Sequence, residues 1–161
     1  MIILYSSIIA FNLLAFKTVK RFSGNTILHI FVFTCALQLI FDVFIDIKYG
    51  GYWYGTKGID WVVLPAYFIL IPPVNLMFLN WFPFSKSLLK KIAYLGIWEV
   101  FLLCYEFITL FPEPWGFFHY GWWSIWHSAF INPFLLMSLL GYYKWVRMLE
   151  GKMIKNSGKV E

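Results

Sequence analysis

Five long apolar stretches alternate with short polar or aromatic segments along the chain. They cover residues 1–16, 25–47, 61–82, 92–111 and 122–143. A membrane-spanning helix needs about 20 mostly apolar residues. Four stretches have that length, and the first reaches it if the helix continues to Val19 and Lys17 extends its ammonium group to the headgroups. The pattern predicts an all-α fold, a polytopic transmembrane bundle of about five spans.

Proline residues interrupt two of these stretches. Neither Pro72 nor Pro73 has a backbone N–H, so a helix through them loses hydrogen bonds. We expect a kink or break there, with Asn75 as a partner for the freed backbone groups. Pro133, next to Asn132, predicts a bend in the fifth stretch.

The composition agrees with a membrane protein. The chain is 61% hydrophobic and only 13% charged, whereas soluble domains carry about 25% charged residues. The net charge of +5 is explained by contact with anionic lipid headgroups, so the expected partner is the bilayer and no nucleic acid is needed. We expect one bundle over residues 1–146, followed by a basic cytoplasmic tail at 147–161, of which "EGKMIKNSGKVE" from Glu150 onward is expected to be frayed and solvated. The sequence leaves the oligomeric state open.

Basic residues predict the orientation. Eleven of the 13 lie in three segments, at 17–21, 86–91 and 144–159. Loops rich in lysine and arginine remain in the cytoplasm. Five spans then place the N-terminus outside and the C-terminus inside. The first stretch has no basic residue before it, so we interpret it as a retained span rather than a secretory signal.

The two remaining loops are rich in aromatic residues. They are "YGGYWYGTKGIDW" at residues 49–61 and "PEPWGFFHYGWW" at residues 112–123. Aromatic residues gather at the membrane interface. A sharper hypothesis is that the two loops pack together as an aromatic cap over the outer end of the bundle.

Polar side chains recur at helical spacing inside three spans. The second span carries one every four residues, at Thr34, Gln38, Asp42 and Asp46. Glu99 and Glu106 lie two turns apart in the fourth span, and the fifth has polar positions at Ser124, His127, Ser128 and Asn132. Each of these helices thus offers one polar side to the bundle.

Three ionisable groups have the same expected depth. Asp42, Glu106 and His127 each lie five residues from the outer end of a span, or roughly 7–8 Å below the boundary. We expect them to converge, with His127 or His119 as a cationic partner for Glu106. Asp46 and His119 would lie above this layer, and Gln38 and Glu99 below it.

Several roles fit such a cluster. It could be a hydrogen-bonded plug that fixes helix packing, a pocket for a small polar molecule, lipid headgroup or ion, a metal-assisted enzyme site, or a proton path. Histidines and carboxylates can bind zinc, but the chain has no H-E-x-x-H, and "HYGWWSIWH" is a weak substitute. We assign no metal ligands and expect no cofactor. Cys35 and Cys104 lie within spans and are interpreted as packing residues.

Short motifs in the second half carry a family resemblance. They are Trp98, then "YE" at Tyr105–Glu106, "HYGWWSIWHS" at His119–Ser128, "FP" before a lysine-containing turn at Phe82–Lys91, and Asp46, Tyr52 and Trp53 ahead of the third span. In this order they resemble an uncharacterised family of small multipass membrane proteins from spore-forming Gram-positive bacteria, over roughly residues 40–145. The resemblance implies a helical protein of the bacterial plasma membrane and carries over no catalytic residues.

The sequence therefore predicts a plasma-membrane protein of unassigned activity. The preferred hypothesis is a binding or interaction protein with a polar pocket facing the outer leaflet. The alternative is a membrane-embedded, metal-assisted enzyme that uses Glu106, His127 and Asp42.

Overall fold

The computed structural model describes residues 1–157, and its side chains up to Met153. The chain is mostly helical, which confirms the all-α prediction, and two three-residue strands join the outer loops. In chain order the elements are α1 (Ile2–Thr18), α2 (Gly24–Asp42), the π-helical η1 (Val43–Lys48), β1 (Tyr52–Tyr54), the π-helical η2 (Ala66–Leu70), α3 (Ile71–Trp81), α4 (Leu88–Thr109), β2 (Phe118–Tyr120) and α5 (Ile125–Ser157).

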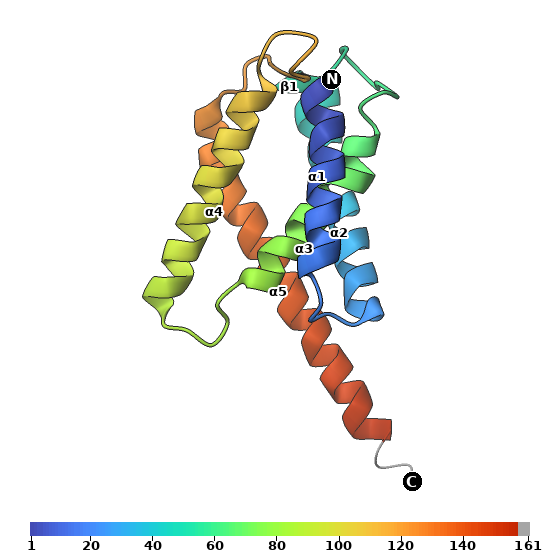
Figure 1. Ribbon diagram of the computed structural model, residues 1–161, viewed down its shortest axis with the longest axis vertical. Coiled ribbons are helices and arrows are strands. Elements are labelled where there is room, and N and C mark those ends of the chain that lie inside the picture. The colour runs from blue at the N-terminus through green and yellow to red at the C-terminus, as the bar shows by residue number, and fades with distance from the viewer. Residues whose placement is uncertain (158–161) are drawn as a thin grey trace.

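The helices form a bundle with distinct ends (Figure 1). The N-terminus and both strands lie at one end, and α5 crosses the bundle and projects beyond the other helices at the opposite end. Helix α3 is central and contacts α1 and α2, whereas α4 packs mainly on α5. We call the end with the strands the outer end and the opposite one the inner end.

Two helical segments are long and apolar enough to cross a membrane, Gly24–Lys48 and Leu88–Thr109. Ile2–Thr18 and Ala66–Trp81 are shorter apolar helices. The third helix thus begins at Ala66, after Pro65, rather than at residue 61, because residues 55–64 form bends and turns after β1. Many large apolar side chains face outward, such as Phe16 at 85% and Ile97 at 70% exposure.

The main hydrophobic core surrounds α3. Phe78 and Leu79 are fully buried there, against Ile30 of α2 and Leu139 of α5. The Tyr94 hydroxyl of α4 donates to the Phe78 carbonyl oxygen over 2.8 Å. Burial of this kind fixes α3 as the element around which the other helices are placed.

The third apolar helix, Ala66–Trp81, changes its helical geometry where the sequence predicts. The chain changes from π- to α-helix between Leu70 and Ile71, which places Pro72 and Pro73 in the first turn of α3, where no N–H is required. A proline frees the carbonyl four residues earlier, which for Pro73 is that of Ile69. Its partner is Asn12 of α1, whose Nδ2 donates over 2.7 Å. The prediction of Asn75 was wrong, because Asn75 instead donates to Thr34 Oγ1 at 3.1 Å.

The fifth helix is longer than predicted. α5 runs without interruption through Pro133 to Ser157, so the fraying predicted from Glu150 onward is wrong up to Ser157. Residues 158–161 of that predicted tail lie outside the described residues. The extension is stabilised at its side by Glu150, which bonds to the start of α2.

The two aromatic loops pair as a small antiparallel sheet. Tyr52 is opposite Tyr120, Trp53 opposite His119, and Tyr54 opposite Phe118. At residue 121 the two loops come so close that a Cβ atom would overlap the Gly50 carbonyl oxygen, so glycine is required. We call β1, β2 and their flanking loops, residues 49–65 and 111–124, the outer cap. Its existence agrees with the hypothesis that the two loops pack together.

Candidate functional site

Side chains alternate between the two faces of the outer cap, as in any strand pair. Tyr52 and Phe118 point inward and are buried. Trp53 and His119 stack on the opposite face, with ring centroids 5.7 Å apart. The Lys57 ammonium lies 4.6 Å from the Trp53 ring centroid. The cap thus has an aromatic inner face and a cationic outer one.

The first strand binds a carboxylate of α2. The Tyr52 hydroxyl donates to Asp42 Oδ1 over 2.5 Å. Gln38, one turn earlier in α2, donates to Asp42 Oδ2 over 2.9 Å. Both oxygens of a side chain that is only 4% exposed therefore have donors, which is what a buried carboxylate requires.

The second strand binds a carboxylate of α4 in the same way. Glu106 Oε1 accepts from the Tyr120 hydroxyl at 2.5 Å and from Ser128 Oγ at 2.6 Å. Ser128 in turn accepts from the Trp123 indole N–H at 2.8 Å. Glu106 Oε2 has no hydrogen-bond partner within residues 1–157.

The two tyrosine–carboxylate pairs are linked through the strands, since Tyr52 and Tyr120 face each other across the sheet. Burial and the adjacent carboxylate raise the pKa of both tyrosines well above the ordinary value, so both hydroxyls remain donors. The pKa of Tyr54 is also raised, first by burial and then by charges that include Asp42 and Glu106. The inner face of the cap thus lies between the two carboxylates.

A cavity of about 190 Å³ lies under the cap. Glu106, Tyr54, Tyr67 and Tyr105 are among its lining residues, and we call it the cap cavity. A second space of about 140 Å³ lies deeper and is lined by Thr34, Gln38, Asn75 and Asn132, among others. The two share the lining residues Ile71, Leu102 and Asn132. They place hydrogen-bonding groups in the middle of an otherwise apolar bundle.

Asp46 lies in η1, one π-helical turn after Asp42, and is 7% exposed. It borders a third cavity together with Asp42 and Asp60. Asp60 differs from the other two because backbone N–H groups of Thr56 and Val62 donate to it and lower its pKa.

Glu99 lies at a deeper level of α4. Its Oε1 is 3.4 Å from Asn132 Nδ2, while Oε2 is buried and has no partner within the described part of the chain. Glu99 and Glu106 share one face of α4, but hydrogen bonds connect them to different residues of α5.

The histidines are not brought to the carboxylates. His127 is exposed, its Nδ1 lies 2.9 Å from Ser124 Oγ at the start of α5, and its ring packs on Trp123. The hypothesis that His127 or His119 pairs with Glu106 was therefore wrong, because Tyr120 and Ser128 occupy that place. Among residues 1–157 no three His, Cys, Asp or Glu side chains are grouped so that they could hold a metal. The metal-assisted enzyme has no support in this geometry.

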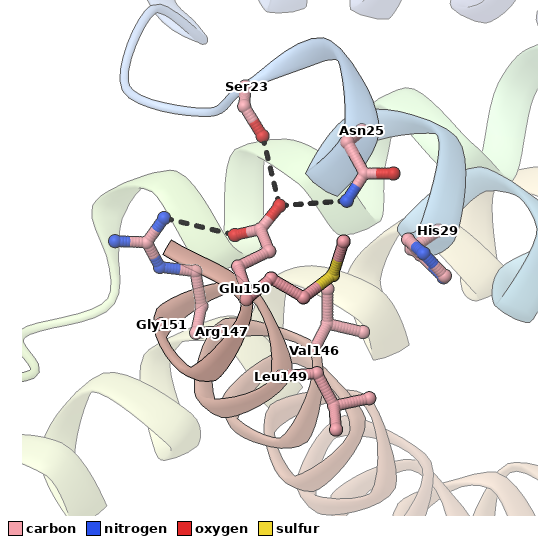
Figure 2. A pocket seen from close by; sticks show the side chains of 9 residues that line it. Ser23, Asn25, His29, Val146, Arg147, Leu149, Glu150 and Gly151 are labelled. Carbon is pink, nitrogen blue, oxygen red and sulfur yellow. Dashed lines mark hydrogen bonds and ion pairs between the residues drawn. The ribbon is translucent and has the colours of Figure 1, made fainter. Parts of the chain in front are cut away.

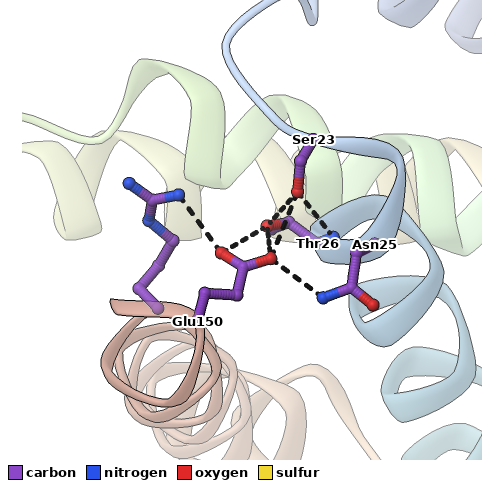
Figure 3. Close-up of polar contacts among 5 residues, drawn as sticks. Ser23, Asn25, Thr26 and Glu150 are labelled. Carbon is purple, nitrogen blue, oxygen red and sulfur yellow. Dashed lines mark hydrogen bonds and ion pairs between the residues drawn. The ribbon is translucent and has the colours of Figure 1, made fainter. Parts of the chain in front are cut away.

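The inner end holds a different polar contact (Figure 3). Glu150 of α5 accepts from Asn25 Nδ2 at 2.9 Å, from Thr26 Oγ1 at 3.0 Å and from Ser23 Oγ at 3.2 Å, while Arg147 Nη1 lies 3.2 Å away. The Asn25 amide first, and then the two hydroxyls and Arg147, hold the pKa of Glu150 below its ordinary value.

A large hollow borders this contact (Figure 2). It has a volume of about 680 Å³, and His29, Val146 and Leu149 line it beside Glu150. Since Ser23, Asn25, Thr26 and Arg147 all contact Glu150, we interpret this contact as a joint between α2 and α5 rather than as a ligand site.

Comparison with known proteins adds no relative: no family model, no curated protein and no solved structure matches this chain. The site is therefore defined by its geometry alone.

Sequence reasoning found the carboxylates and placed Gln38, a donor to Asp42, on the same side of the second helix, but it did not identify the other donors. These other donors are Tyr52, Tyr120 and Ser128, and the two tyrosines lie in loops that were interpreted only as aromatic. One sequence signal could have indicated the two tyrosine donors: each aromatic loop contains a tyrosine that follows, within about 15 residues, an acidic residue of the preceding helix.

Proposed function

We propose that this chain is a five-span protein of the bacterial plasma membrane, with its N-terminus outside and its C-terminus inside. The basic segments after α1, before and within the start of α4, and along the end of α5 lie at the inner end, as cytoplasmic segments do. The N-terminal amine instead donates to the Pro114 and Gly116 carbonyl oxygens of the outer cap. Outward-facing apolar side chains favour contact with lipid.

We further propose that the protein binds a small polar molecule or ion under the outer cap. The observation that carries this is Glu106, which borders the cap cavity, has two donors on Oε1 and leaves Oε2 without a partner. A carboxylate held by protein donors on one oxygen is fixed in orientation, so the other oxygen is available to a ligand. Aromatic and apolar walls with few placed polar groups are typical of ligand sites.

The test is native mass spectrometry of the full chain purified from bacterial membranes in mild detergent. We expect a small-molecule adduct on the natural protein. Leu102 borders both inner spaces, so Leu102→Trp would fill them and remove the adduct. Ile97→Trp adds the same bulk to a side chain of α4 that is 70% exposed, and it should retain the adduct.

Absence of an adduct from the natural protein, or an adduct that persists in Leu102→Trp, would contradict this function. The helical fold of each variant is checked by circular dichroism. A folded Leu102→Trp protein that still carries the adduct therefore places the molecule elsewhere on the chain.

A further inference from the structure

A third cavity at the outer end lies between the end of α2 with η1 and the turns that follow β1. Its volume is about 220 Å³. Asp42, Asp46 and Asp60 border it, as do Tyr54 and Tyr67, and most of its remaining lining is aliphatic. Asp60 already accepts hydrogen bonds from Thr56 and Val62. We call it the acidic cavity. Although it shares the two tyrosines with the cap cavity, Glu106 does not border it.

Asp46 has an unusual environment within this cavity. It is 7% exposed, yet within the described residues its carboxylate oxygens accept no hydrogen bond and form no ion pair; the Gly50 N–H donates only to its backbone carbonyl oxygen. Asp42, 4% exposed, uses both oxygens for Tyr52 and Gln38. A buried carboxylate without a partner is costly, and π-helical turns such as η1 are frequent at functional sites.

No cationic side chain borders the cavity. The nearest lysines along the chain are engaged elsewhere, Lys48 over the Phe44 and Tyr49 rings and Lys57 over the Trp53 ring. The ion pair described for residues 1–157, Arg147–Glu150, lies at the inner end. Two like charges four residues apart on one helical face repel each other, so a bound cation would stabilise the pair.

The residues that line the acidic cavity indicate which class of cation it can bind. Calcium takes six to eight oxygen ligands and magnesium a near-octahedral oxygen set, whereas two of the three carboxylates here, Asp42 and Asp60, already accept hydrogen bonds and most of the other lining residues are apolar. A primary ammonium group has three N–H donors for carboxylates, and tyrosine ring faces attract it as well. The volume equals about seven waters at roughly 30 Å³ each, so the cavity has room for an apolar body attached to the ammonium group.

We propose that the acidic cavity binds a primary ammonium group carried on a small apolar body, with Asp46 as its main carboxylate and Tyr54 and Tyr67 as its aromatic walls. This rests on the proposed function, a membrane protein that takes a ligand at its outer end. The ammonium group belongs either to a free amine or to the ethanolamine headgroup of an outer-leaflet lipid.

The experiment uses the full chain in phosphatidylcholine nanodiscs, titrated with 2-phenylethylammonium while binding and thermal unfolding are followed. 2-Phenylethanol, similar in shape and uncharged, is the control probe. Asp46→Asn keeps the shape but removes the charge, and we expect at least about tenfold weaker binding of the ammonium probe. Glu113→Gln removes an exposed acidic group of the outer cap instead and should leave the affinity unchanged.

A second set of nanodiscs contains phosphatidylethanolamine. If the headgroup is the natural source, it competes and weakens binding of the probe; unchanged affinity assigns the site to a free amine. Both results agree with the proposal, because each requires the ammonium probe to bind at Asp46.

Three results would overturn the proposal. The first is that the ammonium probe does not bind at about 10 mM, a concentration high enough to detect weak binding. The others are equal affinity for 2-phenylethanol and an unchanged affinity for the ammonium probe in a folded Asp46→Asn protein. The comparison of the two probes needs only the natural chain, so it decides the matter even where the variant does not fold. The two proposals can fail separately. If mass spectrometry finds an adduct that Leu102→Trp removes, but the ammonium probe does not bind, the proposed function is retained and only the amine site is rejected.

Discussion

At the scale of single residues, tyrosine hydroxyls rather than cations bind Asp42 and Glu106. Glu106 accepts from Tyr120 and Ser128. Glu106→Ala would leave two hydroxyls without an acceptor, and we expect it to lower the free energy of unfolding by about 1–3 kcal/mol. Glu106→Gln keeps an amide oxygen as acceptor and should cost less than about 1 kcal/mol. Equal losses in denaturant unfolding of the detergent-solubilised protein would show that the charge itself is required.

The Asp42 pair gives a parallel prediction. Tyr52→Phe removes the donor to Oδ1 and leaves Gln38 as the remaining one, so we expect a loss of about 1–2 kcal/mol. Tyr49→Phe is the matched control, because Tyr49 is 56% exposed and should change stability by less than about 0.5 kcal/mol. If the two variants unfold at the same temperature, the Tyr52 bond does not hold the cap.

The residue scale also shows what the sequence could predict. Spacing every four residues correctly indicated that Thr34, Asp42 and Asp46 face the interior, where all three are buried. The partners could not be predicted in this way. Tyr52 and Tyr120 reach the acids only because their loops pair in one register, and spacing within one helix carries no information about another loop.

At the scale of elements, the outer cap depends on close backbone approach. The Gly121 amide donates to the Gly51 carbonyl oxygen over 2.8 Å, and a Cβ at residue 121 would overlap the Gly50 carbonyl oxygen. We expect Gly121→Ala to destabilise by about 1–3 kcal/mol and to weaken retention of a ligand under the cap.

Gly141 of α5 is the control for that substitution. A Cβ there meets no atom within 4 Å, so Gly141→Ala should raise stability by up to about 1 kcal/mol through helix propensity. Thermal unfolding of both variants decides the matter. A stable Gly121→Ala protein would mean that the strand pairing is not as close as described.

The joint between α2 and α5 gives a dependence on pH. Because hydrogen bonds hold the pKa of Glu150 below its ordinary 4.5, its ionised form stabilises the fold fully above pH 4.5, and that stabilisation is lost as the pH falls through the lower folded value. Glu150→Gln should therefore be less stable than the natural chain at pH 7, with the difference disappearing in acid. A difference independent of pH would contradict the ionised joint.

Helix boundaries followed the sequence least well where tertiary contacts decide them. Pro72 and Pro73 predicted a break in the third span, yet that helix starts at Ala66 because the preceding turns belong to the cap. α5 continues past residue 147 because Glu150 has partners at the start of α2. The hydropathy of the sequence contains no information about either of these tertiary contacts.

At the scale of the whole molecule, the proposed orientation unites these features. The outer cap, the cap cavity and the acidic cavity lie at one end, and the basic segments lie at the other. Every proposed ligand contact therefore depends on the cap facing outward from the cell.

Cysteine labelling in intact cells tests that claim most directly. In a background without Cys35 and Cys104, a membrane-impermeant maleimide is applied to Glu113→Cys in the outer cap and to Ser87→Cys before α4, both at exposed positions. We predict that Glu113→Cys reacts in intact cells and that Ser87→Cys reacts only after the membrane is opened. The reverse pattern, or equal labelling of both positions, would contradict the orientation and with it the outward-facing site.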